Sequence, residues 1–402
     1  MSSGEPGAGP GGDLREPRLE GRGTAAGAIA EPMPRARLTQ RRVVASGVFV
    51  ASGVAFLYLV LPKLAGLGTA AHRIERGDSW WIAIGVLLEL LSFAGYVVLF
   101  RSVFVRDEKR FGWREGQERF GWRESYQITM SGLAATRLFA TAGAGGVALT
   151  AWALRRSGME PRIVACRMVA FLVLLYGIYA GSVLIDGVGL AVGLFPGGGS
   201  FAITAVPAIV AGLLLALGVA VALLPEDIER RLGDWSSGSG RLGPFLATAA
   251  TVPALASSGL RTAAGLVRSR DPGLLGAPAW WGFDIGVLWA MFHAFGSPPP
   301  FTVIVMAYFL GMLGNLLPLP GGLGGVEGGM IGAFVAFGVD FNLAVLAVLS
   351  YRAISFWLPT IPGAVAYFGL RRTVARWRDE QVSSTVAGTR APVEPAGVLQ
   401  SS

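Results

Sequence analysis

Long apolar runs separated by short polar segments occupy the chain from residue 43 to residue 376. A helix needs roughly 20 apolar residues to cross the hydrocarbon core of a bilayer. Several runs approach or exceed that length: 43–61, 80–104, 163–190, 201–224, 279–295, 301–317 and 343–370. The runs 126–154 and 244–267 are apolar but interrupted, and the run 326–339 would cover only about 21 Å as a helix. The pattern predicts an all-α fold, a polytopic membrane helix bundle.

The two ends of the chain differ from this apolar region. Residues 1–42 are rich in Gly, Pro and Arg, and residues 377–402 are polar, so both are expected to be disordered tails around a membrane domain at 43–376. No small-residue cleavage site follows the run 43–61, which favours an uncleaved first span over a signal peptide. Only 15% of the 402 residues are charged, whereas soluble domains are usually about 25% charged.

Basic residues in the loops predict the orientation, because cytoplasmic loops carry an excess of Lys and Arg. Clusters at 35–42 and 371–378 place both termini in the cytoplasm, and this use of the net charge of +8 requires no nucleic-acid partner. Two more clusters, at 101–123 and 155–162, flank the interrupted run 126–154. Both are cytoplasmic if that run is re-entrant and turns back at its Gly-rich break, 142–146. The alternative is one long helix that follows the charge rule imperfectly.

A second break, at 318–325, lies after the run 301–317, which begins at an uncharged and therefore external loop, 297–300. The two broken segments then enter the membrane from opposite sides. This arrangement suggests an inverted repeat, a common plan of transporters with a site at the midplane. The run 244–267 is followed by Arg268 and Arg270, so it either turns back or lies at the membrane interface.

Ionisable residues within the apolar runs are the candidates for function, because a charge at the bilayer centre costs at least about 2.5–3.5 kcal/mol. Glu327 follows the second break and opens a short helix; it could meet a cationic headgroup, pair with Arg352 or cap the helix. Arg352 and Arg137 could each bind a lipid phosphate through the guanidinium fork or neutralise an acid. Glu89, near the middle of 80–104, is more easily explained by a partner than by headgroup contact.

Other ionisable residues are weaker candidates. Asp284 and Arg167 lie about one turn from the ends of their runs and are expected to snorkel to the interface. Arg261 is expected to mark an interfacial face. Asp186 and His293 lie near external ends, and a lone His is more often packed or interfacial than a ligand.

Two repeated patterns have ordinary explanations beside functional ones. The sequence Arg-Phe-Gly-Trp-Arg-Glu occurs at 110–115 and again at 119–124; it suits the lipid headgroup region or is a tandem duplication in a tolerant loop. Glycines four residues apart, at 324/328, 328/332 and 177/181, most often indicate close helix packing in membranes.

The run 320–329, Pro-Gly-Gly-Leu-Gly-Gly-Val-Glu-Gly-Gly, resembles the Pro-Gly-Gly-Leu-Gly-x-x-Glu motif of the lysylphosphatidylglycerol synthase transmembrane family, also called flippase-like. Asn315, Tyr351-Arg352, the run 356–359 and Gly363 also fit, and the resemblance covers about residues 40–375. The region 136–146 lacks the Glu of the Pro-x-Arg-x-Gly-Glu type motif found in many relatives. The soluble aminoacyl-transferring domain of bifunctional members is absent, so the chain resembles a stand-alone membrane module.

The resemblance implies translocation of an aminoacylated or otherwise polar-headed lipid between leaflets. The excess of Arg over Lys, with abundant Gly and Ala, is compatible with a GC-rich bacterial genome, so a bacterial inner membrane is expected. The candidate substrate-binding residues are Glu327, Arg352, Arg137, Asn315, Gly321, Gly322, Gly324 and Glu89.

The sequence shows no nucleotide-binding motif, so transport is expected to be passive or driven by an ion or proton gradient. It also contains no HExxH, GxSxG or paired acidic motif and a single cysteine, so no enzyme activity, metal or cofactor is expected. Two alternatives stay open. The first is a membrane scaffold or sensor that partners a lipid-modifying enzyme, and the second is an intramembrane lipid transferase.

Overall fold

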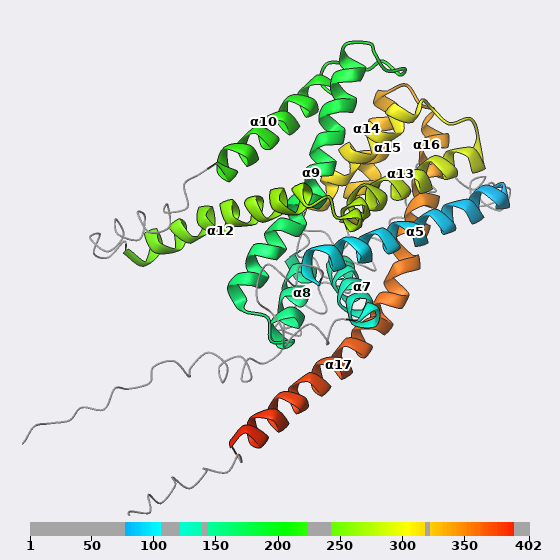
Figure 1. The fold of residues 1–402 in the computed structure, drawn as a ribbon. Coiled ribbons are helices and arrows are strands. Elements are labelled where there is room, and N and C mark those ends of the chain that lie inside the picture. The colour runs from blue at the N-terminus through cyan, green and yellow to red at the C-terminus, as the bar shows by residue number, and fades with distance from the viewer. Residues whose placement is uncertain (1–76, 106–120, 139–143, 224–242, 318–321, 390–402) are drawn as a thin grey trace, which may run out of the picture.

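The fold is known from a computed structural model of the chain. It describes residues 77–105, 121–138, 144–223, 243–317 and 322–389, and the regular elements in these ranges are helices (Figure 1). The expected tail 1–42, the expected span 43–61 and Gly321 lie outside the described residues, as does most of the repeated loop 110–124.

The helices follow the apolar runs of the sequence closely. They are α5 (Ser79–Phe104), α7 (Trp122–Leu138), α8 (Ala144–Arg156), α9 (Pro161–Ala191), α10 (Ala205–Ala222), α12 (Gly243–Arg268), α13 (Gly276–Phe295), α14 (Phe301–Met312), α15 (Gly325–Ala336), α16 (Phe341–Arg352) and α17 (Leu358–Thr389). Short 3₁₀ helices occupy Pro272–Leu275 and Leu313–Leu316, and a π-helix at Ala353–Trp357 joins α16 to α17.

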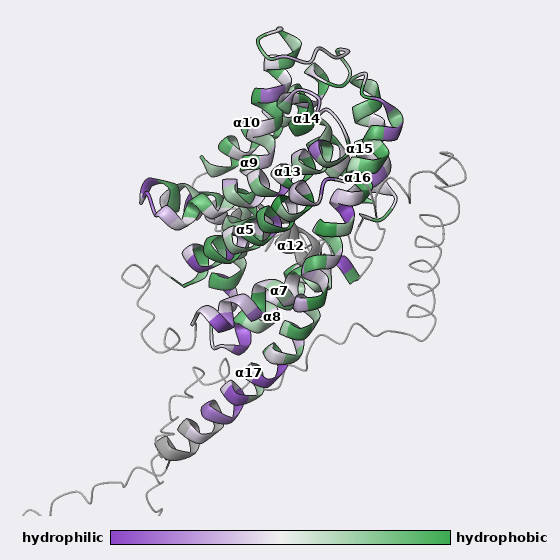
Figure 2. Cartoon of the chain, turned by 90° about the vertical axis from the view of Figure 1, so that its right-hand side faces the viewer, coloured by the Kyte–Doolittle hydropathy of each residue, from purple (hydrophilic) through white to green (hydrophobic). Residues whose placement is uncertain are grey.

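Within the described residues, four helical stretches are long and apolar enough to cross a membrane. They are Ser79–Phe104, Pro161–Ala191, Ala205–Ala222 and Phe341–Glu380. Each coincides with a predicted span, so the prediction of a polytopic helical bundle is confirmed. Figure 2 shows hydrophobic residues over most of the bundle and hydrophilic residues at the lower end of α17. This helix runs on to Thr389, beyond the expected domain end at residue 376.

Helices α5 and α13 pack against each other antiparallel and cross the centre of the bundle (Figure 1). Their backbones approach closely at Gly95, where a Cβ atom would lie 3.1 Å from the carbonyl oxygen of Gly276. The hydroxyl group of Ser92 donates a hydrogen bond of 2.9 Å to the carbonyl oxygen of Trp280. Because the helices run in opposite directions, this register brings the middle of α5 opposite the middle of α13.

Helices α7 and α8 form an antiparallel hairpin. A Cβ atom at Gly146 of α8 would collide with the carbonyl oxygen of Gly132 on α7, and one at Gly132 would lie 2.8 Å from the hydroxyl oxygen of Thr150. The chain therefore reverses direction around the predicted break, and the alternative of one long helix is wrong. The side from which the hairpin enters a membrane stays a prediction.

Helices α14 and α15 form a second antiparallel hairpin, in which Gly311 and Gly314 allow the two backbones to approach closely. A Cβ atom at Gly311 would lie 2.8 Å from the backbone nitrogen of Met330, and Gly314 has no room for one against Gly325. The run 301–317 thus forms half of a hairpin, because α14 has 12 residues and packs back against α15; that this hairpin starts and ends outside the membrane stays a prediction. The order long helix, hairpin, long helix occurs twice (α5 to α9, and α13 to the joined helix of α16 and α17), while the inverted repeat itself stays a prediction.

Two expectations about helix breaks and glycines are corrected. Helix α12 runs without a break for 26 residues, so the segment 244–267 does not turn back; an interfacial position stays a prediction. Gly177, Gly181, Gly328 and Gly332 meet no atom within 4 Å where a Cβ would stand. Within the described residues, their spacing therefore does not mark contacts between helices.

Helix α17 begins at a π-helix and packs on α7. Pro359 follows the π-helix and Pro362 lies inside α17, and proline cannot donate the backbone hydrogen bond of a regular helix. Local rearrangement to a π turn is a known response to such a break. Gly363 permits the contact with α7, since a Cβ there would lie 2.7 Å from the carbonyl oxygen of Met130. The hydroxyl of Thr373 also donates to the side chain of Gln127 at 2.9 Å.

Candidate functional site

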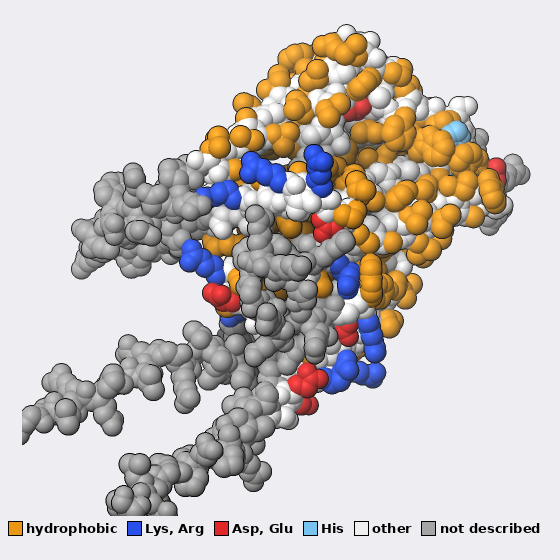
Figure 3. Space-filling view, viewed as in Figure 1, with side chains coloured by type: hydrophobic (Ala, Val, Ile, Leu, Met, Phe, Trp, Pro, Cys, Tyr) orange, Lys and Arg blue, Asp and Glu red, His pale blue; other side chains and the backbone are white. Residues whose placement is uncertain are grey.

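A cavity of about 920 Å³ lies between the two hairpins and the long helices. Residues from α5, α7, α8, α9, α10, α12, α13, α14 and α16 line it, together with the 3₁₀ helix Leu313–Leu316 and the π-helix. Both hairpins thus contribute to the same cavity, although they lie far apart in sequence. Figure 3 shows hydrophobic side chains over the upper part of the molecule and Arg side chains lower down and over α12.

The outer wall of the cavity is apolar and formed by α9, α10 and α12. It includes Leu214 and Val219 of α10 and Val267 of α12, and these side chains are exposed. Gly177 on α9 also lines this wall and has nothing near its Cβ position. Gly177 therefore leaves open space at the cavity wall.

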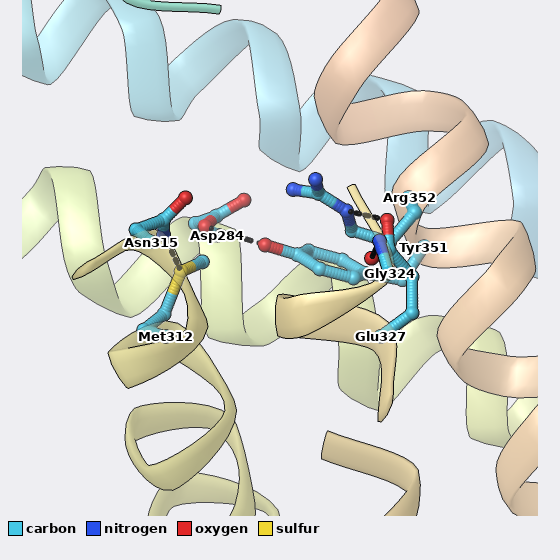
Figure 4. Close-up of polar contacts among 7 residues, drawn as sticks. All are labelled: Asp284, Met312, Asn315, Gly324, Glu327, Tyr351 and Arg352. Carbon is cyan, nitrogen blue, oxygen red and sulfur yellow. Dashed lines mark hydrogen bonds and ion pairs between the residues drawn. The ribbon is translucent and has the colours of Figure 1, made fainter. Parts of the chain in front are cut away.

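Glu327 and Arg352 form a buried ion pair beside the cavity (Figure 4). Arg352 donates from Nε to Glu327 Oε1 at 2.8 Å, and the side chains are only 11% and 5% exposed. The other oxygen, Oε2, accepts a hydrogen bond of 2.6 Å from the backbone nitrogen of Gly324 at the start of α15. Two of the three roles considered for Glu327, helix cap and partner of Arg352, thus occur together.

The backbone before Glu327 needs glycine at two positions. Gly322 has φ +66° and Gly324 has φ +82°, values that cost an L-residue roughly 1–2 kcal/mol. This left-handed turn aims the Gly324 amide at the Glu327 carboxylate. The conformational demand explains why the break is rich in glycine.

Asp284 lies at the centre of the site, contrary to the expectation that it snorkels from a helix end. Its Oδ2 atom accepts hydrogen bonds from the hydroxyl groups of Tyr308 on α14 and of Tyr351 on α16, the latter at 2.9 Å. The side chain is 6% exposed. The expectation was wrong because α13 begins at Gly276, which places Asp284 more than two turns inside the helix.

Glu89 faces Asp284 across the contact between α5 and α13. The residue is 1% exposed, and the contact of Leu88 with Gly286 brings it to the level of Asp284, whose carboxyl group acts on it electrostatically. Among the described residues its Oε2 atom has no hydrogen-bond partner. Arg137 and Arg352 act on Glu89 electrostatically. Glu89 thus lies among another acid and two arginines.

Arg137, the basic residue in the last turn of α7, reaches the same cluster. It lines the cavity, and its guanidinium carbon lies 5.6 Å from the ring centre of Phe93. Its Nη1 atom is buried and makes no hydrogen bond to any described residue. A buried guanidinium donor without an acceptor is costly, so an anion in the cavity would stabilise it.

Asn315 also lines the cavity, from the tip of the second hairpin. Its side chain is exposed, and Nδ2 contacts the sulfur of Met312 at 3.3 Å. The structure therefore gathers Glu327, Arg352, Arg137, Asn315 and Glu89 around one centre, as Figure 4 shows for three of them.

The weaker candidates lie elsewhere. His293 stacks on Trp81 with ring centres 4.3 Å apart, which agrees with the expectation of a packed His. Arg167 donates to the carbonyl oxygen of Phe104 at 2.9 Å, at the end of α5. Arg261 bonds to Ser257 within α12, and Asp186 is buried on α9 away from the cavity lining.

Sequence reasoning missed Tyr308 and undervalued Asp284. Tyrosines in apolar helices resemble ordinary core residues. The sequence showed an acid and two tyrosines in three different apolar runs, but nothing in it indicated that they meet. Tertiary packing alone shows that the two hydroxyl groups converge on one carboxyl oxygen.

Comparison with known protein families shows which family the chain belongs to. The profile of a family described as the lysylphosphatidylglycerol synthase TM region matches residues 43–363, most of the chain. The chain belongs to this family. Every charged residue of the central cluster, from Glu89 to Arg352, lies inside the matched range. The part of the chain that matches the family profile therefore includes the charged residues around the cavity.

Curated proteins named UPF0104 membrane protein, from Methanothermobacter thermautotrophicus (strain ATCC 29096 / DSM 1053 / JCM 10044 / NBRC 100330 / Delta H), match shorter segments. One match is 42% identical over 79 residues, 19% of this chain and 24% of the relative. Another is 35% identical over 96 residues, 23% of this chain and 27% of the relative. The chain thus matches about a quarter of the length of these relatives, whose name gives a membrane location and no activity.

Proposed function

We propose that the protein is an integral membrane lipid translocase, which moves a polar-headed lipid between the two leaflets. The observation that carries this proposal is the cavity itself. It connects a buried polar cluster, with Arg137 and Arg352, to an apolar and exposed wall of α9, α10 and α12. A lipid has the same division, a polar head and apolar tails.

The headgroup would lie at the inner end of the cavity. A phosphate there would accept from Arg137 Nη1, which makes no hydrogen bond to any described residue. Charge-assisted hydrogen bonds contribute roughly 1.5–3 kcal/mol, enough to offset part of the cost of bringing a phosphate to the bilayer interior. Asn315 and the two tyrosines add neutral hydrogen-bonding groups.

The tails would remain outside the cluster, against α9, α10 and α12. Leu214 and Val219 are exposed along this wall, and lipid chains can fill such a surface without displacing water. The volume of about 920 Å³ falls in the range of ligand cavities, about 300–1,000 Å³. It holds a headgroup and the first part of the tails, while the rest of each chain stays in the bilayer.

The proposal is tested by lipid movement in vesicles. The purified full chain is reconstituted into phosphatidylcholine vesicles that contain a trace of fluorescent phosphatidylglycerol, and a quencher added outside reports movement between leaflets. Replacing Arg137 by Gln should slow movement about tenfold or more, since 1.4 kcal/mol corresponds to a factor of ten. The matched control is Arg261→Gln, which removes an Arg of α12 that does not line the cavity.

Movement by Arg137→Gln at the wild-type rate would remove Arg137 from the site. No movement by the wild-type protein with any labelled phospholipid, in vesicles shown to contain folded protein, would refute translocation itself.

A second candidate, a scaffold that holds a lipid-modifying enzyme, is favoured by one observation. Gly324, which precedes α15, and Gly328 and Gly332 on α15 form an exposed stripe with no described atom near their Cβ positions, and such stripes permit close approach of another membrane helix. Replacing Gly328 by Leu should abolish co-purification with a partner and leave lipid movement unchanged if the protein is a scaffold. Loss of lipid movement without loss of any partner would contradict this candidate.

A further inference from the structure

Two acidic side chains face each other near the middle of two long helices. Glu89 lies on α5 and Asp284 on α13, both less than 10% exposed. Ser92 bonds to Trp280, and a Cβ atom at Gly286 would lie 3.2 Å from Leu88, a register that brings Glu89 and Asp284 to the same level of the two helices. The two carboxyl groups act on each other electrostatically at this level. The titratable and charged groups that face this pair from neighbouring helices are Arg137 of α7, Tyr308 of α14, and Tyr351 and Arg352 of α16.

The charges of the central cluster do not cancel when every group is ionised. Glu89, Asp284 and Glu327 supply three negative charges among the described residues, against two positive charges on Arg137 and Arg352. The sum is −1. Glu327 is already engaged by Arg352 and by the Gly324 amide, so the excess negative charge falls on the Glu89–Asp284 pair.

The free oxygen of the pair is on Glu89. Both tyrosine hydroxyl groups donate to Asp284 Oδ2, while Glu89 Oε2 accepts no hydrogen bond from a described residue. Two adjacent carboxyl groups in a low-dielectric site cannot both stay ionised without a large penalty, and one shared proton removes it. A proton on the pair also brings the sum of charges to zero.

We propose that Glu89 and Asp284 together form a proton-binding site, and that binding of an anionic headgroup at the arginines favours its occupation. In this step one proton passes from a hydronium ion to a carboxyl oxygen of the pair: an O–H bond of the hydronium ion breaks and leaves water, an O–H bond forms on the carboxyl group, and the cluster gains one positive charge. The coupling to lipid rests on the proposed function; the proton site itself does not.

The sign of the coupling follows from the charges. A phosphate bound to Arg137 offsets the positive charge of its guanidinium group. Less of that charge is then available to stabilise an ionised Glu89, on which the same group acts. The pair therefore holds its proton more strongly when an anionic headgroup is bound. Linkage is reciprocal, so the proton in turn favours binding of the anion, and a proton gradient could drive its movement.

A metal cation fits the pair less well than a proton. Hard cations such as Ca²⁺ take six to eight oxygen ligands. Among the described residues no group of three or more His, Cys, Asp and Glu side chains is arranged to hold an ion, and Asp284 Oδ2 is occupied by two phenol donors.

Infrared difference spectroscopy of the full chain in phosphatidylcholine vesicles tests the site directly. A protonated carboxyl group has a C=O stretch that an ionised one lacks. The wild-type protein should show this band at neutral pH, and Glu89→Gln and Asp284→Asn should each lose it. Wild-type spectra in vesicles that also contain phosphatidylglycerol should show a stronger band at the same pH, a comparison that needs no variant to fold.

Asp186 supplies the control for both measurements. It is a buried carboxyl group on α9 outside the cavity lining, so Asp186→Asn should leave the lipid-dependent part of the band unchanged. The spectra with and without phosphatidylglycerol are compared at high salt, which suppresses the general effect of an anionic membrane surface on local acidity.

Spectra of Glu89→Gln and Asp284→Asn that equal the wild-type spectrum at every pH overturn the proton site. A band that is lost in both variants, but has the same strength with and without phosphatidylglycerol, overturns the coupling. A band that behaves as expected while no labelled lipid moves supports the proton site and refutes translocation. Lipid movement without the band refutes the proton site alone, so the two failures can be told apart.

Discussion

Replacing Arg352 by Met removes the cation that pairs with Glu327 and keeps most of the aliphatic side chain. The Glu327 side chain is 5% exposed, so its Oε1 atom would lose the cation that bonds to it and remain away from water. The Gly324 amide would still bond to Oε2. Removing one partner of a buried ion pair costs about 3–5 kcal/mol, and we expect a loss of folding free energy in this range.

The double variant Glu327→Gln with Arg352→Met separates the lost charge from lost packing. A neutral Gln can still accept the Gly324 amide, and no unpaired charge is left. We expect the double variant to be less destabilised than Arg352→Met alone, with a coupling of about 1–3 kcal/mol between the two positions. The measurement is denaturant unfolding of the purified protein in lipid bicelles, with the two single variants and the double variant compared.

The control is the exposed pair of Arg378 and Asp379 on α17, with side chains 60% and 70% exposed and atoms 3.3 Å apart. Exposed pairs contribute little, so Arg378→Met should change the unfolding free energy by less than about 0.5 kcal/mol. If Arg352→Met costs no more than Arg378→Met, the central ion pair is not buried as described and the reasoning about the site is refuted.

Three further predictions use other parts of the site. Gly324→Ala places a Cβ at φ +82° and should lower the unfolding free energy by about 1–2 kcal/mol, whereas equal stability would show that the turn relaxes. Tyr351→Phe removes one donor to Asp284 and should cost about 1 kcal/mol by the same measurement; no loss would mean that Tyr308 suffices. Gly177→Leu fills open space at the cavity wall, so it should slow lipid movement in vesicles without loss of stability, and unchanged movement would place the lipid path elsewhere.

Much of the fold could be predicted because apolar runs of membrane length have few alternatives to a helix. The long runs became α5, α9, α10 and the joined helix of α16 and α17. Length alone did not decide the role of every run. The run 301–317 was long enough to cross, but glycines at 311 and 314 bring it against α15 and make it half of a hairpin.

The candidate site was predicted in part for the same reason. An ionisable residue inside an apolar run must find partners, and this requirement alone singles out Glu89, Arg137, Glu327 and Arg352. The sequence could not show which partner each one takes. Asp284 was undervalued because its distance from the helix end depends on where α13 starts, and that start lies earlier than the apolar run indicates.

The sequence by itself determined that the chain is a helical membrane protein with two glycine-rich breaks and a small set of buried charges. Composition and helix periodicity are local properties, and the bilayer leaves few ways to satisfy the backbone. Only the tertiary structure decided that Glu327 is held by Arg352 and that Glu89 faces Asp284. Those pairings depend on the register between helices far apart in sequence, which is fixed by close glycine contacts and hydrogen bonds that no local pattern contains.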